Sequence, residues 1–212
     1  MATILDPVRS GLVTSLARPG GNITGNSFIE PYLGAKRLQI LKELLPSVTR
    51  IGELINPTNP AYEILRSGEE AALRQLGMQG IFIDVANAGQ LEGAFAELAR
   101  RGAEALVVHL DTVFLSNRAQ IMKLAATHAL PTMAEGRQFA EVGAVLSYAH
   151  SGAEMIRNAA VFIDKIFKGA KPGDLPIEQP TRFELVINLK AARALGIAIP
   201  QSLLLRADEV IQ

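Results

Sequence analysis

The chain has 212 residues, of which 49% are hydrophobic and 20% are charged, so it is long and apolar enough to fold around a core rather than remain disordered. Its 21 Lys and Arg residues balance 21 Asp and Glu residues, and this neutral charge gives no reason to expect nucleic acid or an anionic membrane as a partner. Cysteine is absent, which excludes disulfides, thiolate catalysis and cysteine-ligated metals.

From residue 36 onward the sequence alternates helix-like and strand-like segments. The expected helices are 36–45, 59–76, 90–101, 116–129, 153–168 and 190–195, and the expected strands are 50–55, 80–85, 105–109, 131–133, 144–148 and 183–188. Such alternation, in units of about 25–30 residues, is typical of right-handed βαβ crossovers. The predicted fold class is therefore α/β with a parallel sheet.

The predicted elements are unevenly distributed along the chain. The segment 36–148 contains enough strands and helices to form a complete α/β lobe. The flanks, 1–35 and 149–212, contain few strands and are expected to be parts of another lobe that is incomplete in this chain. The pattern leaves the assignment of 183–212 open.

The helix expected at 153–168 is apolar on more than one side. One row at helical spacing is Met155, Ala159, Phe162 and Ile166, and a second row is Ile156, Ala160, Ile163 and Phe167. Few strands outside 36–148 are available to bury these rows. We therefore expect self-association through the 153–168 helix.

No catalytic motif is found in the sequence. The three histidines, His109, His128 and His150, are far apart, and none has the spacing of a metal-binding pair. Nucleophile-elbow and phosphate-loop motifs are also missing. His109 ends a predicted strand, where a site residue could lie, but a lone histidine there is more often structural. We therefore predict a protein that is not an enzyme and that needs no metal and no cofactor.

Polar residues follow the ends of several predicted strands, where ligands bind in open α/β sheets. These candidate ligand-binding residues are Asn56, Thr58, Asn59, Asp111, Thr112, Glu135 and Tyr148. The first three would take a polar or anionic end of the ligand, with Asn59 as the N-cap of the helix and Pro60 in its first turn. Asp111 would take an amine, although helix capping explains both Asn59 and Asp111 equally well. Tyr148 would stack on the ligand or simply close the edge of the sheet.

A series of short motifs extends over nearly the whole chain. It includes Asp6-Pro7-Val8, Arg18-Pro19-Gly20-Gly21-Asn22, Leu41-Lys42-Glu43-Leu44-Leu45-Pro46, Asn56-Pro57, Gly136-Arg137, Leu146-Ser147-Tyr148, Lys168-Gly169-Ala170-Lys171-Pro172, Leu175-Pro176-Ile177-Glu178-Gln179-Pro180 and Ala207-Asp208-Glu209-Val210-Ile211. In this order the motifs closely resemble the ABC transporter substrate-binding proteins that include the tryptophan-binding type.

The resemblance implies a periplasmic-binding-protein fold of type I, in which two α/β lobes joined by crossing strands close on a small molecule. It implies crossings at 26–34 and 149–152, and it makes Gly25, Asn26 and Ser27 candidates for the hinge that could also reach the ligand. Members of the family carry about a hundred further residues before the Asp-Pro-Val segment, including an export signal and most of the first lobe, so we expect that part to be lacking here.

The resemblance also implies a function, the capture of a solute, such as an amino acid, outside the cytoplasm for the permease of an ABC importer. Location in the periplasm, or outside the cytoplasm on a membrane anchor, follows from the resemblance alone, because residues 1–6 lack the features of an export signal. The alternative is a ligand-sensing effector domain of a regulatory protein with the same fold. No helix-turn-helix segment or basic face favours that alternative.

Overall fold

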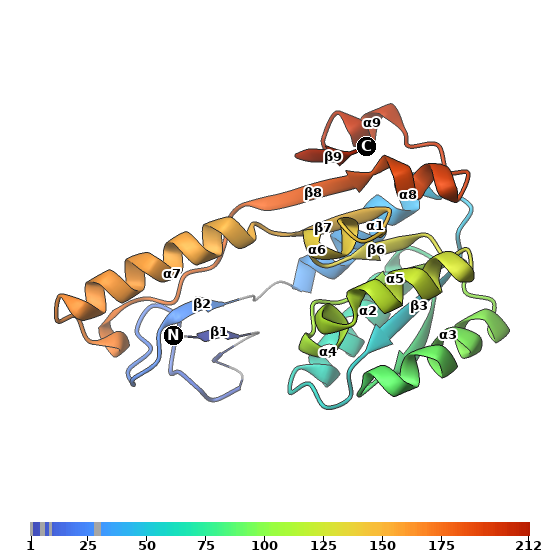
Figure 1. The fold of residues 1–212 in the computed structure, drawn as a ribbon. Helices are drawn as coiled ribbons and strands as arrows, with labels where there is room; N and C mark the ends of the chain where they lie inside the picture. Colours follow the sequence, from blue (N-terminus) through green and yellow to red (C-terminus); the bar gives the residue numbers. More distant parts are fainter. Residues whose placement is uncertain (1, 5–6, 9, 28–30) are drawn as a thin grey trace. The chain divides into compact units, whose positions relative to one another are not determined.

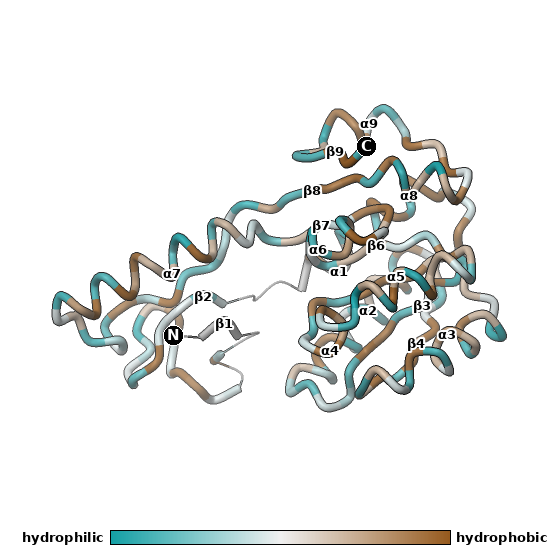
Figure 2. The backbone as a smooth tube through the Cα atoms, viewed as in Figure 1, coloured by the Kyte–Doolittle hydropathy of each residue, from teal (hydrophilic) through white to brown (hydrophobic). Residues whose placement is uncertain are grey.

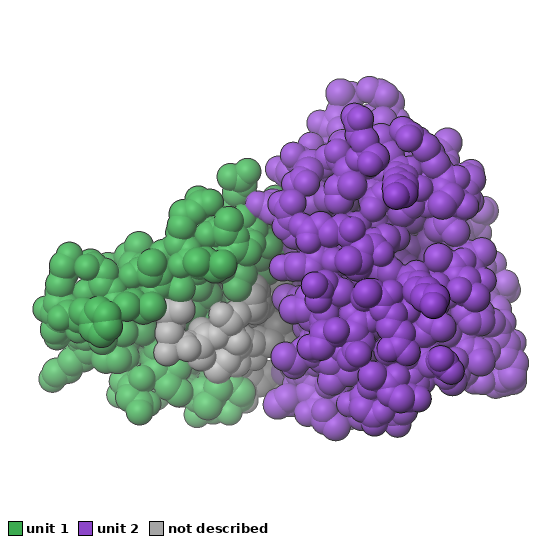
Figure 3. All heavy atoms as spheres, viewed as in Figure 1, with its two compact units in different colours: residues 1–30, 150–183 green, residues 31–149, 184–212 purple. Residues whose placement is uncertain are grey.

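The structure is a computed structural model that describes residues 2–4, 7–8, 10–27 and 31–212. Its chain forms two compact units, one from 1–30 and 150–183 and the other from 31–149 and 184–212 (Figure 3). The unit boundaries therefore fall at three places along the chain, between residues 30 and 31, 149 and 150, and 183 and 184.

The larger unit is built on a sheet whose strand order is β4-β3-β5-β6-β7-β8-β9 (Figure 1). The strands are β3 (Arg50–Ile55), β4 (Gln79–Asp84), β5 (Ala105–Val108), β6 (Thr132–Ala134), β7 (Leu146–His150), β8 (Phe183–Asn188) and β9 (Glu209–Ile211). The pairs from β4 through β7, and the pair β8–β9, are parallel. Beside β7, Asn188 N donates to Val145 O at 2.9 Å while Ser151 N donates to Arg182 O at 3.1 Å, so β8 runs antiparallel to β7.

Helices cover both faces of this sheet. They are α1 (Pro31–Leu44), α2 (Tyr62–Gln75), α3 (Leu91–Arg100), α4 (Thr112–Ser116), α5 (Arg118–Thr127), α6 (Arg137–Ala140), α8 (Leu189–Ala194) and α9 (Gln201–Leu204). On one face, α1, α2, α8 and α9 pack on Ile51, Val107 and Met133. On the other face, α3 and α5 pack on Leu54 and Val108. The result is a three-layer α/β unit with a core on each side of the sheet.

The predicted α/β class and the six predicted strands are confirmed, with ends displaced by one or two residues. The start of the helix expected at 59–76 was predicted wrongly. Pro60 lies in a turn, and the helix begins at Tyr62 with Ala61 as its N-cap. The helix expected at 116–129 is α5, which runs from Arg118 to Thr127. The short helix α4 before it was not expected, and Asn117 separates the two.

The sequence left the assignment of 183–212 open, and the structure places 184–212 in the larger unit. The reason is packing. Leu185 and Ile187 of β8 are buried in the core beside α1, and Ala192 and Leu203 of the following helices complete that core. The apolar alternation of 183–188 predicts a strand but does not specify which sheet the strand joins.

The smaller unit contains β1 (Ala2–Ile4), which pairs in parallel with β2 (Gly25–Ser27), and α7 (Gly152–Phe167). Asn26 Nδ2 donates to the backbone oxygen of Met155 at 3.3 Å, so β2 and α7 are joined by a side chain as well as by packing. Phe162 of α7 is buried. The described helices of both units include none that is long and apolar enough to cross a membrane.

One apolar row of α7 lies on the surface. Ile156, Ile163 and Phe167 are 74%, 44% and 86% exposed, whereas Phe162 of the other row is 2% exposed. Hydrophobic and hydrophilic residues accordingly alternate along this helix in Figure 2. Such a row is unusual on a soluble monomer and favours contact with another apolar surface.

The first prediction concerns this exposed row. We expect the chain to self-associate at micromolar concentration, and we expect Ile156→Glu with Phe167→Glu to return it to the monomer, because two charges would have to be desolvated in the contact. Sedimentation velocity measures both. A matched control is Val8→Glu with Leu110→Glu, at two exposed apolar positions outside α7. A wild-type chain that stays monomeric at 100-fold higher concentration would contradict the prediction.

Candidate functional site

Four of the sequence-predicted residues form one hydrogen-bonded network at the carboxyl ends of β3 and β5. Asp111 Oδ1 accepts from Asn56 Nδ2 at 3.1 Å, and Asp111 Oδ2 accepts from Asn59 Nδ2 at 2.8 Å. Asn56 Oδ1 in turn accepts from the backbone N–H and the hydroxyl of Thr58, at 3.0 and 2.8 Å. The sequence placed these residues after two separate strands, and the parallel pairing of β3 with β5 brings the strand ends together.

Each member of this network also fixes the backbone. Asp111 is the N-cap of α4 and accepts from Val113 N at 2.8 Å, so the capping interpretation of this residue is confirmed. Asn59 is not a helix cap; its Oδ1 accepts from Ala61 N at 2.9 Å in the turn before α2. The network is therefore rigid, with the Asp111 side chain buried and both of its oxygens engaged.

The remaining predicted residues lie in different surroundings. Thr112 is the exposed first residue of α4. Tyr148, on β7, is half-buried and packs against the core on the α1 side. Gly25, Asn26 and Ser27 are the buried residues of β2 in the smaller unit. Residues 28–30, at the expected crossing, lie outside the described residues.

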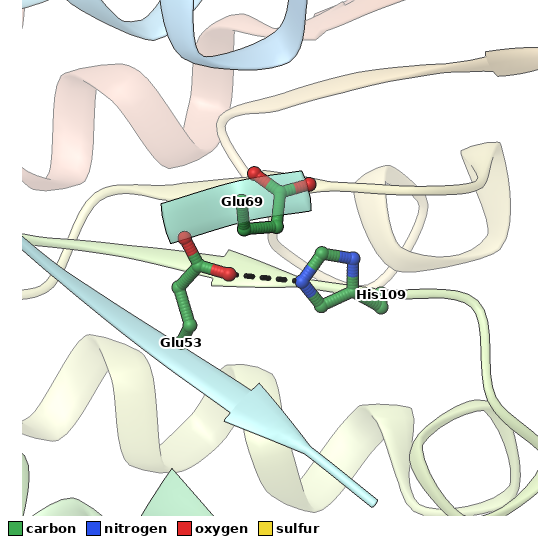
Figure 4. Close-up of side chains that lie close together, drawn as sticks. All are labelled: Glu53, Glu69 and His109. Atoms are coloured by element: carbon green, nitrogen blue, oxygen red, sulfur yellow. Dashed lines mark hydrogen bonds and ion pairs between the residues drawn. The ribbon is translucent and has the colours of Figure 1, made fainter. Parts of the chain in front are cut away.

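Glu135 belongs to a second group, a buried ionic cluster that the sequence did not predict. The cluster consists of Arg37, Glu53, Glu69, His109 and Glu135. His109 Nε2 lies 3.0 Å from Glu53 Oε2, and His109 Nδ1 lies 3.8 Å from Glu135 Oε2. Arg37 Nη2 lies 3.5 Å from Glu135 Oε2 and 3.8 Å from Glu69 Oε1. Figure 4 shows Glu53, Glu69 and His109 close together, with a dashed line between the Glu53 carboxylate and the His109 ring.

Strand register explains why these groups meet. The strand pairs Leu54–Val108 and Val108–Ala134 put the next residues, His109 and Glu135, at the same level on neighbouring strands. Alternation along β3 puts Glu53 on the same face, which α1 and α2 cover. Gly34 of α1 makes room for the cluster, because a Cβ at this position would collide with the Glu69 carboxylate.

Burial and neighbouring charges shift the pKa values of three groups. Burial raises the pKa of Glu53 to about 7, helped by the negative charge of Glu69. For His109, burial opposes the charged imidazole, but the neighbouring carboxylates of Glu135 and Glu53 outweigh burial and raise its pKa to about 10. For Glu135, burial opposes ionisation, but the Arg37 guanidinium and then His109 lower its pKa to about 2. Glu135 is thus an ionised carboxylate whose side chain is 20% exposed.

Glu53, Glu69 and His109 are the described residues whose side-chain atoms could hold a metal ion, with ligand atoms within 4.8 Å of one another. The surroundings do not fit a cation, because the buried guanidinium of Arg37 already lies against Glu69 and Glu135. Glu53 Oε1, Glu69 Oε2 and His109 Nδ1 lack hydrogen-bond partners among the described residues. Arg37 Nε and Nη1 also lack partners among these residues. Unpaired donors and acceptors in one cluster fit a set of paired charges with room for bridging water.

The sequence contained a weak signal of this cluster. Glu53 interrupts an apolar strand, and His109 ends another. A titratable residue in a buried strand needs a partner, and this rule could have pointed to both residues. Arg37 and Glu69 gave no such signal, since both lie in helices among exposed charged residues.

Comparison with known proteins shows similarity over almost the entire chain. Residues 1–211 match a family described as ABC transporter substrate binding protein. The chain is 24% identical over 198 residues to a tyrosine-binding protein of Clostridioides difficile (strain R20291), covering 93% of this chain and 56% of that protein. The chain therefore spans about half the length of the curated relative it matches.

Two solved structures are closely similar. One is an ABC domain from Streptococcus pneumonia in complex with L-Trp, which is 27% identical with a TM-score of 0.91 and is matched over 100% of this chain and 70% of that chain. The other is a conserved domain protein from Vibrio cholerae, 26% identical with a TM-score of 0.88, over 97% of this chain and 68% of that chain. The fold is thus the periplasmic-binding-protein type I α/β fold expected from the sequence.

Proposed function

The chain belongs to the ABC transporter substrate-binding protein family, and we propose that it captures an amino acid, with an aromatic side chain, outside the cytoplasm for an ABC importer. The family is a binding family and not an enzyme family, which agrees with the lack of nucleophile and metal-site motifs in the sequence. The aromatic class is suggested by the tyrosine-binding relative and by the L-Trp complex.

The observation that carries the proposal is the rigid polar network at the carboxyl edge of the parallel sheet. Asn56 and Asn59 each use one amide hydrogen toward Asp111 and keep a second that could donate to a carboxylate. Asp111 Oδ2 accepts from Asn59 and could accept another hydrogen bond from an ammonium group. Amide donors beside a carboxylate acceptor suit the two charged ends of a zwitterionic amino acid.

Two partners follow from the proposal. The small-molecule ligand would stabilise the closed arrangement of the lobes, and a permease in the membrane would receive the ligand. An effector domain of a regulator is the alternative with the same fold, and the family match favours transport. We propose Gly25, Asn26 and Ser27 as hinge residues, and Thr112, Glu135 and Tyr148 as further ligand contacts.

The experiment that tests the proposal is calorimetric titration of the protein with L-tryptophan and with L-tyrosine. We expect one binding event for at least one of the two, and none for glycerol or glucose. If neither amino acid binds, the proposed ligand class is wrong. Turnover of either amino acid that is abolished by a single substitution would contradict the non-enzymatic function.

The second prediction concerns Asp111. We expect Asp111→Asn to weaken binding of the amino acid by about 1.5–3 kcal/mol, the range for a hydrogen bond to a charged group. We also expect a loss of stability of about 1–2 kcal/mol, because an amide would face the Asn56 and Asn59 donors.

Asp84→Asn is the matched control for the Asp111 variant, because Asp84 ends the neighbouring strand β4 but is exposed and bonds to Tyr62. Calorimetry on folded protein measures affinity, and urea titration measures stability. An unchanged affinity of the Asp111 variant would mean that Asp111 caps α4 but does not bind the ligand.

A further inference from the structure

The buried ionic cluster is connected to the polar network at the sheet edge through one carboxylate. Glu135 Oε2 lies near donors from three sides: Arg37 Nη2 at 3.5 Å, His109 Nδ1 at 3.8 Å and the backbone N–H of Leu110 at 3.3 Å. Leu110 immediately precedes Asp111, which holds Asn56 and Asn59. A short path of contacts therefore leads from the interior to the proposed ligand contacts.

Each element that packs on the cluster contributes a charge. Arg37 comes from α1, Glu69 from α2, Glu53 from β3 and Glu135 follows β6, while His109 lies at their centre after β5. Three carboxylates thus face one guanidinium and one imidazole. When the imidazole is charged, a single net negative charge remains, and when it is neutral two negative charges remain in a largely buried space.

We propose that His109 is a positioning residue for the ligand-binding edge, which as an imidazolium holds Glu53 with one nitrogen and Glu135 with the other, and so fixes Leu110 and Asp111. This role rests on the proposed function, because the proposed function places a ligand at this edge. His109 itself is 2% exposed and does not touch the ligand in this account. Its loss would let Glu135 turn toward Arg37 alone and release the Leu110 N–H.

The test uses His109→Gln, which keeps a donor but cannot carry the charge, and His128→Gln as the control. His128 lies on the opposite face of the sheet, where its ring stacks on Phe95 with a 5.9 Å centroid distance. In the folded His109 variant we expect shifted NMR signals of Leu110, Asp111 and the Asn56 side chain. We also expect an affinity for L-tryptophan or L-tyrosine at least tenfold lower than wild type. The control should change neither.

A measurement on the wild type keeps the proposal testable if the variant does not fold. Carbon-detected NMR follows the three histidine rings and the carbonyl carbons of Leu110 and Asp111 between pH 7 and 10.5. We expect these carbonyl signals to titrate with the same midpoint as the His109 ring, and not with that of His128. If His109 contributed only to stability, the carbonyl signals of Leu110 and Asp111 would not titrate with its ring.

The outcomes separate the two proposals. If the carbonyls do not follow the ring, or if folded His109→Gln keeps wild-type edge signals and affinity, the positioning role is overturned. If neither amino acid binds wild-type protein while the carbonyls do follow the ring, the coupling stands and the proposed ligand class fails.

Discussion

Replacement of Arg37 by methionine is expected to lower the free energy of unfolding of the larger unit by about 3–5 kcal/mol. Arg37 is 3% exposed, and its guanidinium lies against Glu69 and Glu135, so its removal leaves two carboxylates without their cation. Methionine has a similar length and adds no charge, which isolates the electrostatic effect. Urea unfolding followed by circular dichroism measures the difference.

Lys36→Met is the control for the Arg37 variant, since Lys36 precedes Arg37 on α1 but is exposed. We expect its effect to stay within about 0.5 kcal/mol. Equal stabilities of the Arg37 variant and the wild type would contradict the pairing, because replacing the cation would then cost nothing. A partial rescue is expected when Glu69→Gln is added to Arg37→Met, because the substitution removes one of the orphaned charges.

Stability is also expected to fall as the pH rises from 7 to 9.5, by up to about 1.4 kcal/mol per pH unit. The pKa of His109 is raised to about 10 in the folded protein, above the value of 6.5 for a free imidazole. A raised pKa stabilises the fold below pH 6.5, and the benefit is lost as the pH rises toward 10. The raised pKa of Glu53 also makes stability fall with rising pH, but at lower pH, between 4.5 and about 7.

The pH effect of His109 can be separated from that of the lysines and tyrosines by comparing variants. Thermal unfolding of His109→Gln should show a smaller loss between pH 7 and 9.5 than wild type, while His128→Gln should keep the wild-type slope. Identical slopes in all three proteins would mean that His109 does not hold a proton in this range. At acid pH the lowered pKa of Glu135 predicts the opposite behaviour, since its contribution is lost as the pH falls from 4.5 toward 2.

The sequence was sufficient to predict the parallel sheet, because short apolar strands and amphipathic helices follow one another in the larger unit. Leu91, Phe95 and Leu98, which are at helical spacing in the sequence, are all buried on α3. The sequence did not predict β1, β2 or β9, each three residues long, because so short a strand carries little alternation of its own. The equally short β6 was predicted because it belongs to the regular alternation of strands and helices. It also could not place 184–212, which depends on pairing between distant segments.

For the site, the sequence predicted the residues after β3 and β5 but not their mutual bonds. Adjacent parallel strands bring Asn56 and Asp111 together across 55 positions of sequence, and only the strand order specifies this. The ionic cluster was missed because its members come from five different elements, and each alone has an ordinary explanation. His109 is the instructive case, since a histidine at a strand end reads as structural until its two carboxylate neighbours are known.

The central claim is that an amino acid binds at the carboxyl edge of the larger unit's sheet. NMR titration of isotope-labelled protein with L-tryptophan tests it most directly, with Asn56, Asn59 and Gln79 as reporters. We expect saturable shifts of the Asn56 and Asn59 side-chain amides and no shift at Gln79, which begins β4 at the amino-terminal edge of the sheet. Shifts at Gln79 with none at Asn56 and Asn59 would contradict it.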